Sequence, residues 1–159
     1  MNSYNKYGPA LLRKCERMLG NAYDAEDVVQ SLFVDLLRKK KTEVDLPYLY
    51  RAVTNRCITI LRKRKNHRRL LENQQEALHA PPRTMLDNRT ISLDLLTKLA
   101  KKLDKKSLEI LVYRYLDDLN LEEIARLTAL SRPTIHKRLL KVRQVAEFLA
   151  QEAENGGQQ

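Results

Sequence analysis

Apolar residues recur every three or four positions through most of this chain, which is the period of an amphipathic α-helix. The clearest case follows Asp24, where Val28, Leu32 and Leu36 form one row of a wide apolar stripe. Similar rows continue along the chain, separated by short polar breaks. The pattern predicts an all-α protein with helices at about residues 9–19, 24–41, 48–67, 91–103, 104–115, 120–127 and 131–149.

Residues at the breaks predict where several helices begin and end. Gly20 tolerates the left-handed conformation that ends a helix. Asp24 is expected to cap the second helix, with Asp27 as the second carboxylate of a capping box. Pro47 fits a first helical turn. Further caps are predicted at Asp104, at Asn120 paired with Glu123, and at Ser131, whose helix tolerates Pro133 in its first turn.

The helical period fades after Leu71, and this divides the chain. Ala80-Pro81-Pro82 favours an extended chain, because consecutive prolines cannot continue a helix. We therefore predict two small helical domains, at residues 1–71 and 91–150, joined by a flexible linker at residues 72–90. The last residues, 151–159, contain Gly156-Gly157 and are expected to be disordered.

The composition favours a polyanionic partner. The chain has 159 residues and a formal net charge of +10, which suits nucleic acid or an anionic membrane surface. Cys15 and Cys57 are expected to be buried thiols, and the three scattered histidines support no metal site. No signal peptide or membrane-spanning apolar run is visible. These features predict a soluble cytoplasmic protein without membrane insertion.

Residues 121–139 form the sharpest local pattern. Two short apolar rows, joined by a tight turn and packed through Ile124, Ala125 and Ile135, predict a helix-turn-helix. The stretch from Ser131 to Val145 holds five Lys or Arg residues and no acid. A solvated basic face on an ordinary helical hairpin is the alternative. The uniformly basic second helix favours DNA binding, because Arg and Lys donate to guanine edges and to phosphates.

Residues 46–71 form a second basic segment, which contains no Asp or Glu. Its arginines and lysines are combined with Tyr48 and Tyr50. This combination fits single-stranded nucleic acid, because unpaired bases stack on aromatic rings while cations meet the backbone. Two alternatives stay open. The helix could lie on a membrane surface, and either tyrosine could belong to the core.

In order, these features resemble the extracytoplasmic-function (group IV) sigma factors of bacterial RNA polymerase. Residues 19–33 resemble the opening of conserved region 2, and residues 46–55 with 61–64 resemble its second half. Residues 103–143 resemble region 4, with Glu123-Ile124-Ala125 and the stretch from Ser131 to Ile135 at its centre. The resemblance covers nearly the whole chain. It implies a sigma factor that directs the polymerase core to promoters and initiates transcription, and not an enzyme.

The resemblance also implies roles for particular residues. The second helix would dock on the clamp coiled coil of the β′ subunit through Asp24, Asp27, Gln30 and Phe33. The basic segment would engage the melted minus-ten element through Lys41, Tyr48, Tyr50, Arg51, Asn55, Arg62 and Arg64. The last helix would read the duplex minus-thirty-five element through Arg132, Pro133, Thr134, His136, Lys137, Arg138 and Lys141. The β flap is a further implied contact, and family members are often held inactive by an anti-sigma factor. No metal, cofactor or catalytic residue is implied.

Three positions depart from the family pattern. The family often has Asp at the position of Thr59, and Gly at the positions of Ala129 and Pro133. Pro133 alters the start of the recognition helix, so the minus-thirty-five preference of a typical member cannot be transferred. The main rival function is a stand-alone helix-turn-helix regulator, which leaves the second helix and the basic segment unexplained. A nuclease would need clustered carboxylates or a nucleophile beside a base, and no spacing assembles them.

Overall fold

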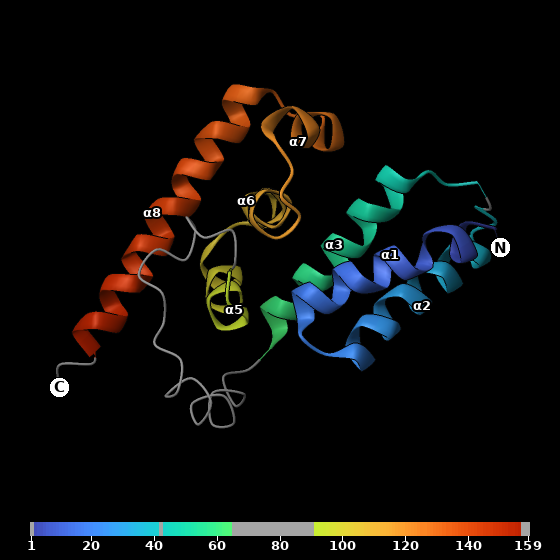
Figure 1. The fold of residues 1–159 in the computed structure, drawn as a ribbon, viewed down its shortest axis with the longest axis horizontal. Coiled ribbons are helices and arrows are strands. Elements are labelled where there is room, and N and C mark those ends of the chain that lie inside the picture. Colours follow the sequence, from blue (N-terminus) through green and yellow to red (C-terminus); the bar gives the residue numbers. More distant parts are fainter. Residues whose placement is uncertain (1, 42, 65–90, 157–159) are drawn as a thin grey trace.

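The computed structural model describes residues 2–41, 43–64 and 91–156, and these residues fold into helices without any strand (Figure 1). The first half consists of α1 (Asn2–Leu19), α2 (Ala22–Arg38) and α3 (Leu46–Lys63). The second half consists of α5 (Leu93–Lys102), α6 (Lys105–Leu111), the π-helical turn η1 (Val112–Leu116), α7 (Leu121–Thr128) and α8 (Arg132–Gly156). The predicted all-α class is confirmed. The predicted linker at residues 72–90 lies outside the described residues.

The first helix is longer than predicted, because α1 begins at Asn2 and contains Pro9 in its interior. Proline removes one backbone donor but does not end this helix. Packing holds the turns before it in place. The Tyr4 ring meets the Phe33 ring edge-on at 5.1 Å between centroids, and Tyr7 packs against the core. Gly20 ends α1 with φ +68°, as its sequence position predicts.

The second helix begins at Ala22, and the prediction that Asp24 caps it is wrong. Asn21 is the cap, because its backbone is extended and its side-chain oxygen accepts from the backbone N–H of Tyr23 at 2.8 Å. Asp24 lies within the first turn, and its carboxylate accepts from Arg64, the C-cap of α3, at 3.0 Å. Asp24 therefore connects two helices. The apolar stripe behind it is buried at Ala25, Val28, Val29, Leu32 and Leu36.

The third helix confirms Pro47 in its first turn, with Asp45 accepting from the backbone N–H of Tyr48 at 3.0 Å. It ends at Lys63, because Arg64 already has an extended backbone. The helix was predicted to continue to about residue 67, and this prediction is wrong at Arg64. Residues 65–67 lie outside the described residues. Cys57 of α3 and Cys15 of α1 are free thiols in the core, as predicted.

The second half confirms the predicted caps. Asp104 caps α6, Asn120 and Glu123 form a reciprocal capping box on α7, and the Ser131 hydroxyl accepts from the Thr134 backbone at 3.3 Å. The last helix continues to Gly156, so the prediction of a disordered tail is wrong for residues 151–156. Extending a formed helix adds one hydrogen bond per residue, and Gln151, Glu152 and Ala153 are good helix formers.

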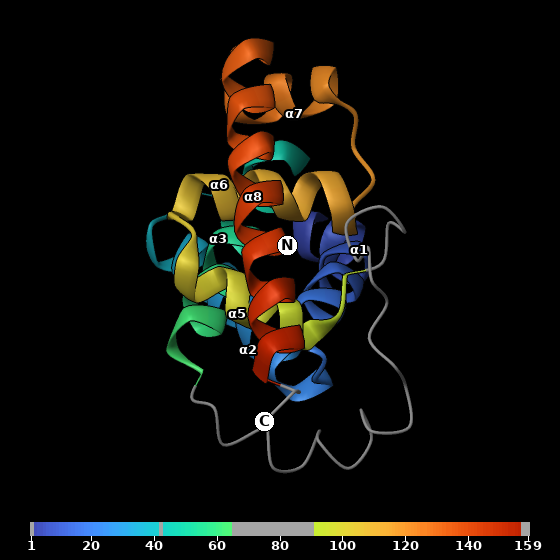
Figure 2. The ribbon, with the colours of Figure 1, turned by 90° about the vertical axis from the view of Figure 1, so that its left-hand side faces the viewer.

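The two halves pack directly on each other. α5 and α6 lie between α8 on one side and α3 on the other (Figure 1), and both contact α3. The view in Figure 2 shows α8 running along the outside of the second half, with α7 at one end. One core cluster includes buried residues of both halves, among them Leu49 and Ile58 from α3 and Leu96 and Leu99 from α5. The helix-turn-helix is packed by a second cluster, which includes Tyr113 of η1, Ile124 of α7 and Ile135 of α8.

Candidate nucleic-acid interface

The outer face of α2 carries an exposed stripe. Asp27 and Gln30 are exposed, and Tyr23, Val34 and Leu37 lie on the same face, with Tyr23 82% exposed. Positions 23, 27, 30, 34 and 37 alternate steps of four and three, the spacing of a coiled-coil seam. We call these five residues the α2 stripe. Asp27 and Gln30, two of the four predicted docking residues, belong to this stripe. The other two point elsewhere: Phe33 is half-buried against Tyr4 and the core, and Asp24 accepts from Arg64.

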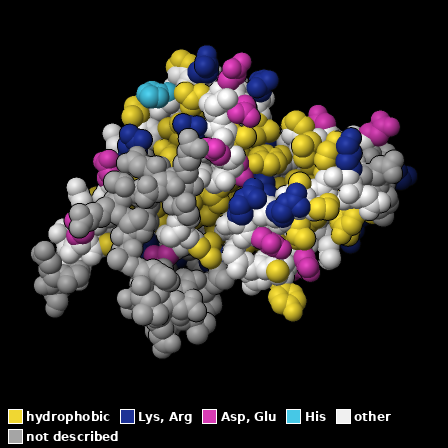
Figure 3. Space-filling view, viewed as in Figure 1, with side chains coloured by type: hydrophobic (Ala, Val, Ile, Leu, Met, Phe, Trp, Pro, Cys, Tyr) yellow, Lys and Arg dark blue, Asp and Glu magenta, His cyan; other side chains and the backbone are white. Residues whose placement is uncertain are grey.

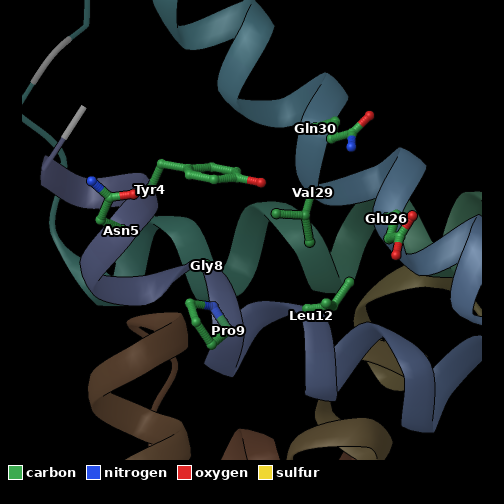
Figure 4. Close-up of a pocket in the computed structure, with 8 residues that line it drawn as sticks. All are labelled: Tyr4, Asn5, Gly8, Pro9, Leu12, Glu26, Val29 and Gln30. Atoms are coloured by element: carbon green, nitrogen blue, oxygen red, sulfur yellow. The ribbon is translucent and has the colours of Figure 1, made fainter.

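A groove of about 400 Å³ separates α1 from α2 beside this stripe (Figure 4). Figure 4 shows the Tyr4 ring reaching from α1 toward Gln30 and Val29 of α2. The other lining residues are Asn5, Gly8, Pro9, Leu12 and Glu26. The groove adds residues of α1 to the surface that the sequence assigned to α2 alone.

The predicted minus-ten residues divide into three groups. Lys41, Tyr48 and Arg62 are exposed, and the Lys41 ammonium lies 5.6 Å from the centre of the Tyr48 ring. Asn55 and Arg64 bond within the first half, to the Arg51 carbonyl and to Asp24. The third group, Tyr50 and Arg51, faces the second half. Only the first group presents its polar atoms freely to solvent.

Tyr50 and Arg51 contact residues of α6 and η1. The Tyr50 ring stacks on Tyr113 at 5.8 Å between centroids, and the Arg51 Nε donates to Glu109 Oε1 at 2.9 Å. The same Glu109 oxygen accepts from the Tyr113 hydroxyl at 2.8 Å. Burial raises the pKa of Tyr50, and the neighbouring Asp117 carboxylate raises it further. The hydrogen bond that Arg51 donates to Glu109 raises the pKa of Arg51.

A buried ion pair lies next to this contact. The Lys14 Nζ of α1 donates to Asp117 Oδ2 at 2.6 Å, and the two side chains are 1% and 2% exposed. The ammonium also lies 4.3 Å from the centre of the Tyr50 ring. Burial lowers the pKa of Lys14, while Asp117 opposes that shift. Arg17 adds a second, more exposed contact to Asp117 at 3.2 Å.

The cluster of Lys14, Asp117 and Glu109 was not predicted from the sequence. One signal was present, because Lys14 follows Leu11 by three positions and precedes Met18 by four. It therefore occupies a position on the apolar face of α1, where an unpaired lysine would be costly. Its partner lies in the other half of the chain, and no local pattern identifies it.

The start of α8 presents an exposed polar face. Arg132, Pro133, His136 and Lys137 are exposed on its first two turns. Thr134 is half-buried, with its hydroxyl 2.8 Å from that of Ser131. Ala129 ends α7 in the left-handed conformation, with φ +60°, and so makes the tight turn of the helix-turn-helix. This is one of the positions where the family often has Gly.

The other two predicted α8 residues are paired with the N-cap of α6. Arg138 donates to Asp104 at 2.8 Å and to the Ser107 hydroxyl at 3.2 Å, and Lys141 donates to Asp104 at 3.3 Å. Burial alone would raise the pKa of Asp104, but the hydrogen bonds from Ser107 and Lys141 lower it well below its usual range. Arg138 and Lys141 therefore orient α8 on α6 as well as carrying positive charge.

Charge on the visible surface is mixed. Figure 3 shows Lys and Arg side chains on both halves, with Asp and Glu side chains among them. Within the described ranges, no group of three His, Cys, Asp or Glu residues could hold a metal ion. Among those same residues, none of the helices has the length and apolar character needed to cross a membrane.

The architecture is that of a two-part helical protein with a helix-turn-helix in its second part. The family description Sigma-70 region 2 matches residues 3–67, and Sigma-70, region 4 matches residues 93–144. The chain is also similar to the ECF RNA polymerase sigma factor SigW of Bacillus subtilis (strain 168). The identity is 28% over 160 residues, which cover 87% of this chain and 81% of that protein.

The chain belongs to the sigma-70 family, and it is a sigma factor of the extracytoplasmic-function type. Proteins of this family bind RNA polymerase core and promoter DNA, and their role is regulatory rather than catalytic. The sigma-factor function predicted from the sequence is confirmed: the chain acts in promoter-specific initiation of transcription. The helices α1–α3 lie within the region 2 match, and α5 to the first part of α8 lie within the region 4 match.

Proposed function

We propose that three separate surfaces divide the work of initiation. The α2 stripe binds the β′ clamp of the polymerase, the α3 surface holds the melted minus-ten element, and the start of α8 reads the duplex minus-thirty-five element. The chain performs no catalysis of its own and acts in the cytoplasm. The β flap and an anti-sigma factor are further proposed partners of this chain.

The geometry of the α2 stripe supports clamp binding. Exposed apolar residues at coiled-coil spacing can pack between the side chains of a partner helix. Here Tyr23, Val34 and Leu37 would supply apolar contacts, while Asp27 and Gln30 between them would supply polar ones. The stripe spans fourteen residue steps, or about 21 Å of helix. That length suits a partner helix and is long for a single loop.

The surface of α3 supports single-strand binding. Tyr48 is exposed beside Lys41, which provides a stacking ring next to a cation. Arg62 is exposed fourteen residues further, about 21 Å along the helix. Tyr50 and Arg51 lie between them on the chain. A strand of DNA could thus follow the exposed face of α3, with a base on the Tyr48 ring and phosphates on Lys41 and Arg62.

The start of α8 supports duplex reading. In a helix-turn-helix, the N-terminal residues of the second helix contact base edges in the major groove. Arg132, His136 and Lys137 are exposed there and are able to donate hydrogen bonds. Pro133 supplies a rigid, apolar position without a backbone donor. Arg138 and Lys141, partly neutralised by Asp104, would contribute mainly to positioning.

The decisive experiment is transcription in vitro with purified RNA polymerase core on a library of genomic fragments. We expect initiation at a defined set of promoters that carry two conserved boxes. DNA footprinting with and without core separates this function from a stand-alone regulator. A sigma factor protects both boxes strongly only with core, whereas equal protection in both lanes would refute the proposal.

A further inference from the structure

The helices α2 and α3 pack against each other and are also joined by two ion pairs. Arg64, the C-cap of α3, donates through Nη2 to Asp24 Oδ2 at 3.0 Å. Arg56 of α3 donates through Nη2 to Asp35 Oδ2 at 2.7 Å and through Nη1 to Ser31 Oγ at 3.3 Å. We call these two contacts the α2–α3 ion pairs. The helices run antiparallel, and eleven residue steps of α2, about 16 Å of helix, separate the two carboxylates.

Partial burial makes these pairs more constraining than ordinary surface pairs. The side chains of Arg64 and Asp24 are 11% and 41% exposed. An arginine that is largely out of water loses a hydrogen bond when its carboxylate moves away, so displacement of α3 from α2 is costly. Arg56 and Asp35 are 33% and 39% exposed, and Arg56 is held a second time by Ser31. The hydrogen bond from Arg56 also lowers the pKa of Asp35.

The α2 partners of these arginines form a row beside the α2 stripe. Asp24, Ser31 and Asp35 each directly follow a member of the stripe in the sequence. One residue step turns an α-helix by about 100°, so this row lies between the stripe and the buried side of α2. A polymerase helix that occupies the stripe is therefore next to the residues that hold α3.

The arginines near the end of α3 point in different directions. Arg62 is exposed, whereas Arg64, two residues later, is 11% exposed and bonds to Asp24. The family resemblance assigns Asp24 to the polymerase clamp and Arg64 to the minus-ten element. In the structure, the charged groups of these two residues bind each other. An external contact by either residue would compete with this bond.

We propose that the α2–α3 ion pairs are positioning contacts, which fix the exposed surface of α3 toward the melted strand when the polymerase binds the α2 stripe. Asp24 and Arg64 act as one unit, and neither contacts the polymerase or DNA. The inference rests on the proposed roles of the α2 stripe and of α3. The strand is held only in complexes where α3 has the productive orientation, so loosening the ion pairs lowers the fraction of such complexes.

The first test is a double-mutant cycle on Asp24→Asn and Arg64→Gln, which remove the charges and change the side-chain shapes little. Promoter opening is followed with saturating core by the permanganate reactivity of unpaired thymines. We expect each single variant to open the promoter at least about threefold more slowly than the wild type, and the double variant to be no slower than the slower single one. Affinity for core, measured by fluorescence titration, should stay at the wild-type value. Direct contacts predict the opposite: Asp24→Asn weakens core binding, Arg64→Gln weakens DNA binding, and the two effects multiply.

The second test uses the other ion pair. Arg56→Gln should also slow opening without changing the affinity for core, and Arg56→Lys, which keeps a cation near Asp35, should recover part of the loss. The matched control is Asp94→Asn, which removes an ion pair of 3.0 Å with Lys98 inside α5 and should change neither quantity. Circular dichroism verifies that each variant is folded at the assay temperature.

The outcomes separate the positioning role from the proposed surfaces. Multiplying effects in the cycle, or weaker core binding by Asp24→Asn, overturn the positioning role. Folded variants of both ion pairs that open the promoter at the wild-type rate overturn it equally. If the wild type with core opens no promoter, the proposed role of α3 fails instead, so the wild-type reaction accompanies every assay.

Discussion

At the scale of single residues, backbone conformation at the helix ends decides which side chains act as caps. Asp104 and Asn120 have the extended backbone of an N-cap and use their side chains as predicted. Asp24 has the right chemistry, but Asn21, three residues earlier, has the extended backbone. Sequence identified the correct residue types in each case. It placed the start of the second helix three residues too late, because the start depends on where the backbone leaves the extended conformation.

Ala129 offers a test of backbone strain. It adopts φ +60°, which costs a residue with a Cβ about 1–2 kcal/mol. Glycine avoids that cost but loses about 0.4–1 kcal/mol through the unfolded chain. Ala129→Gly should therefore increase the free energy of unfolding by about 0.5–1 kcal/mol, measured by urea denaturation. Ala125→Gly in the body of α7 is the control and should decrease it.

Asp104 offers a test of pH dependence. The pKa of Asp104 is lowered in the folded protein, so its charge stabilises the fold above its usual pKa of about 4. This contribution to the free energy of unfolding is lost as the pH falls from about 4 through the lower pKa that Asp104 has in the folded protein. Asp104→Asn keeps a capping side chain but removes the charge. We expect the variant to be less stable at neutral pH, and the difference should shrink in acid. A difference independent of pH would contradict the ionic role.

At the scale of elements, periodicity located the helices well and their ends less well. The helix start at Asn2, the continuation of α8 to Gly156 and the π-helical turn at Val112–Leu116 were not predicted. Their causes differ: packing of Tyr4 on Phe33 supports the early start of α1. The end of α8 continues a formed helix through exposed residues. In the π-helical turn, the Asp117 backbone N–H donates to the Val112 carbonyl at 3.0 Å. Periodicity also could not say that Leu37 is exposed while Leu36 is buried.

The α2 stripe leads to a prediction about polymerase binding. Val34→Asp places a charge in the middle of the stripe, at a position that is already 44% exposed. We expect binding to purified core to weaken at least tenfold, by about 1.4 kcal/mol or more, while the unfolding temperature changes little. Ala10→Asp, an exposed residue of α1, is the control. Unchanged core binding by Val34→Asp would remove the stripe from the interface.

The start of α8 leads to a prediction about salt dependence. If Lys137 contacts a phosphate, Lys137→Ala should reduce the slope of log affinity against log salt by about 0.9 for promoter binding by the holoenzyme. Lys102→Ala, at the exposed end of α5, should leave the slope unchanged. A base contact by Lys137 would instead alter the preferred promoter sequence.

At the scale of the whole molecule, the two halves share one core and should unfold together. The Lys14–Asp117 pair and the close approach of Leu93 to Gly20 join the two halves directly. We expect one cooperative transition in calorimetry for the wild type, and two resolved transitions for Asp117→Ala. Two transitions in the wild type would show that the halves are energetically independent.

The sequence alone determined the helical class, the two-part division and the sigma-factor identity, because periodicity and short motifs are local properties of the chain. It also supplied the exposed residues at the start of α8 and the Tyr48 surface of α3. Only the tertiary structure decided that Tyr50 and Arg51 face the second half. Lys14 and Asp117 are 103 residues apart, and their pairing arises when two separately formed apolar faces meet and exclude water. The position of Lys14 on the apolar face of α1 indicates that it needs a partner, but no local pattern identifies Asp117 as that partner.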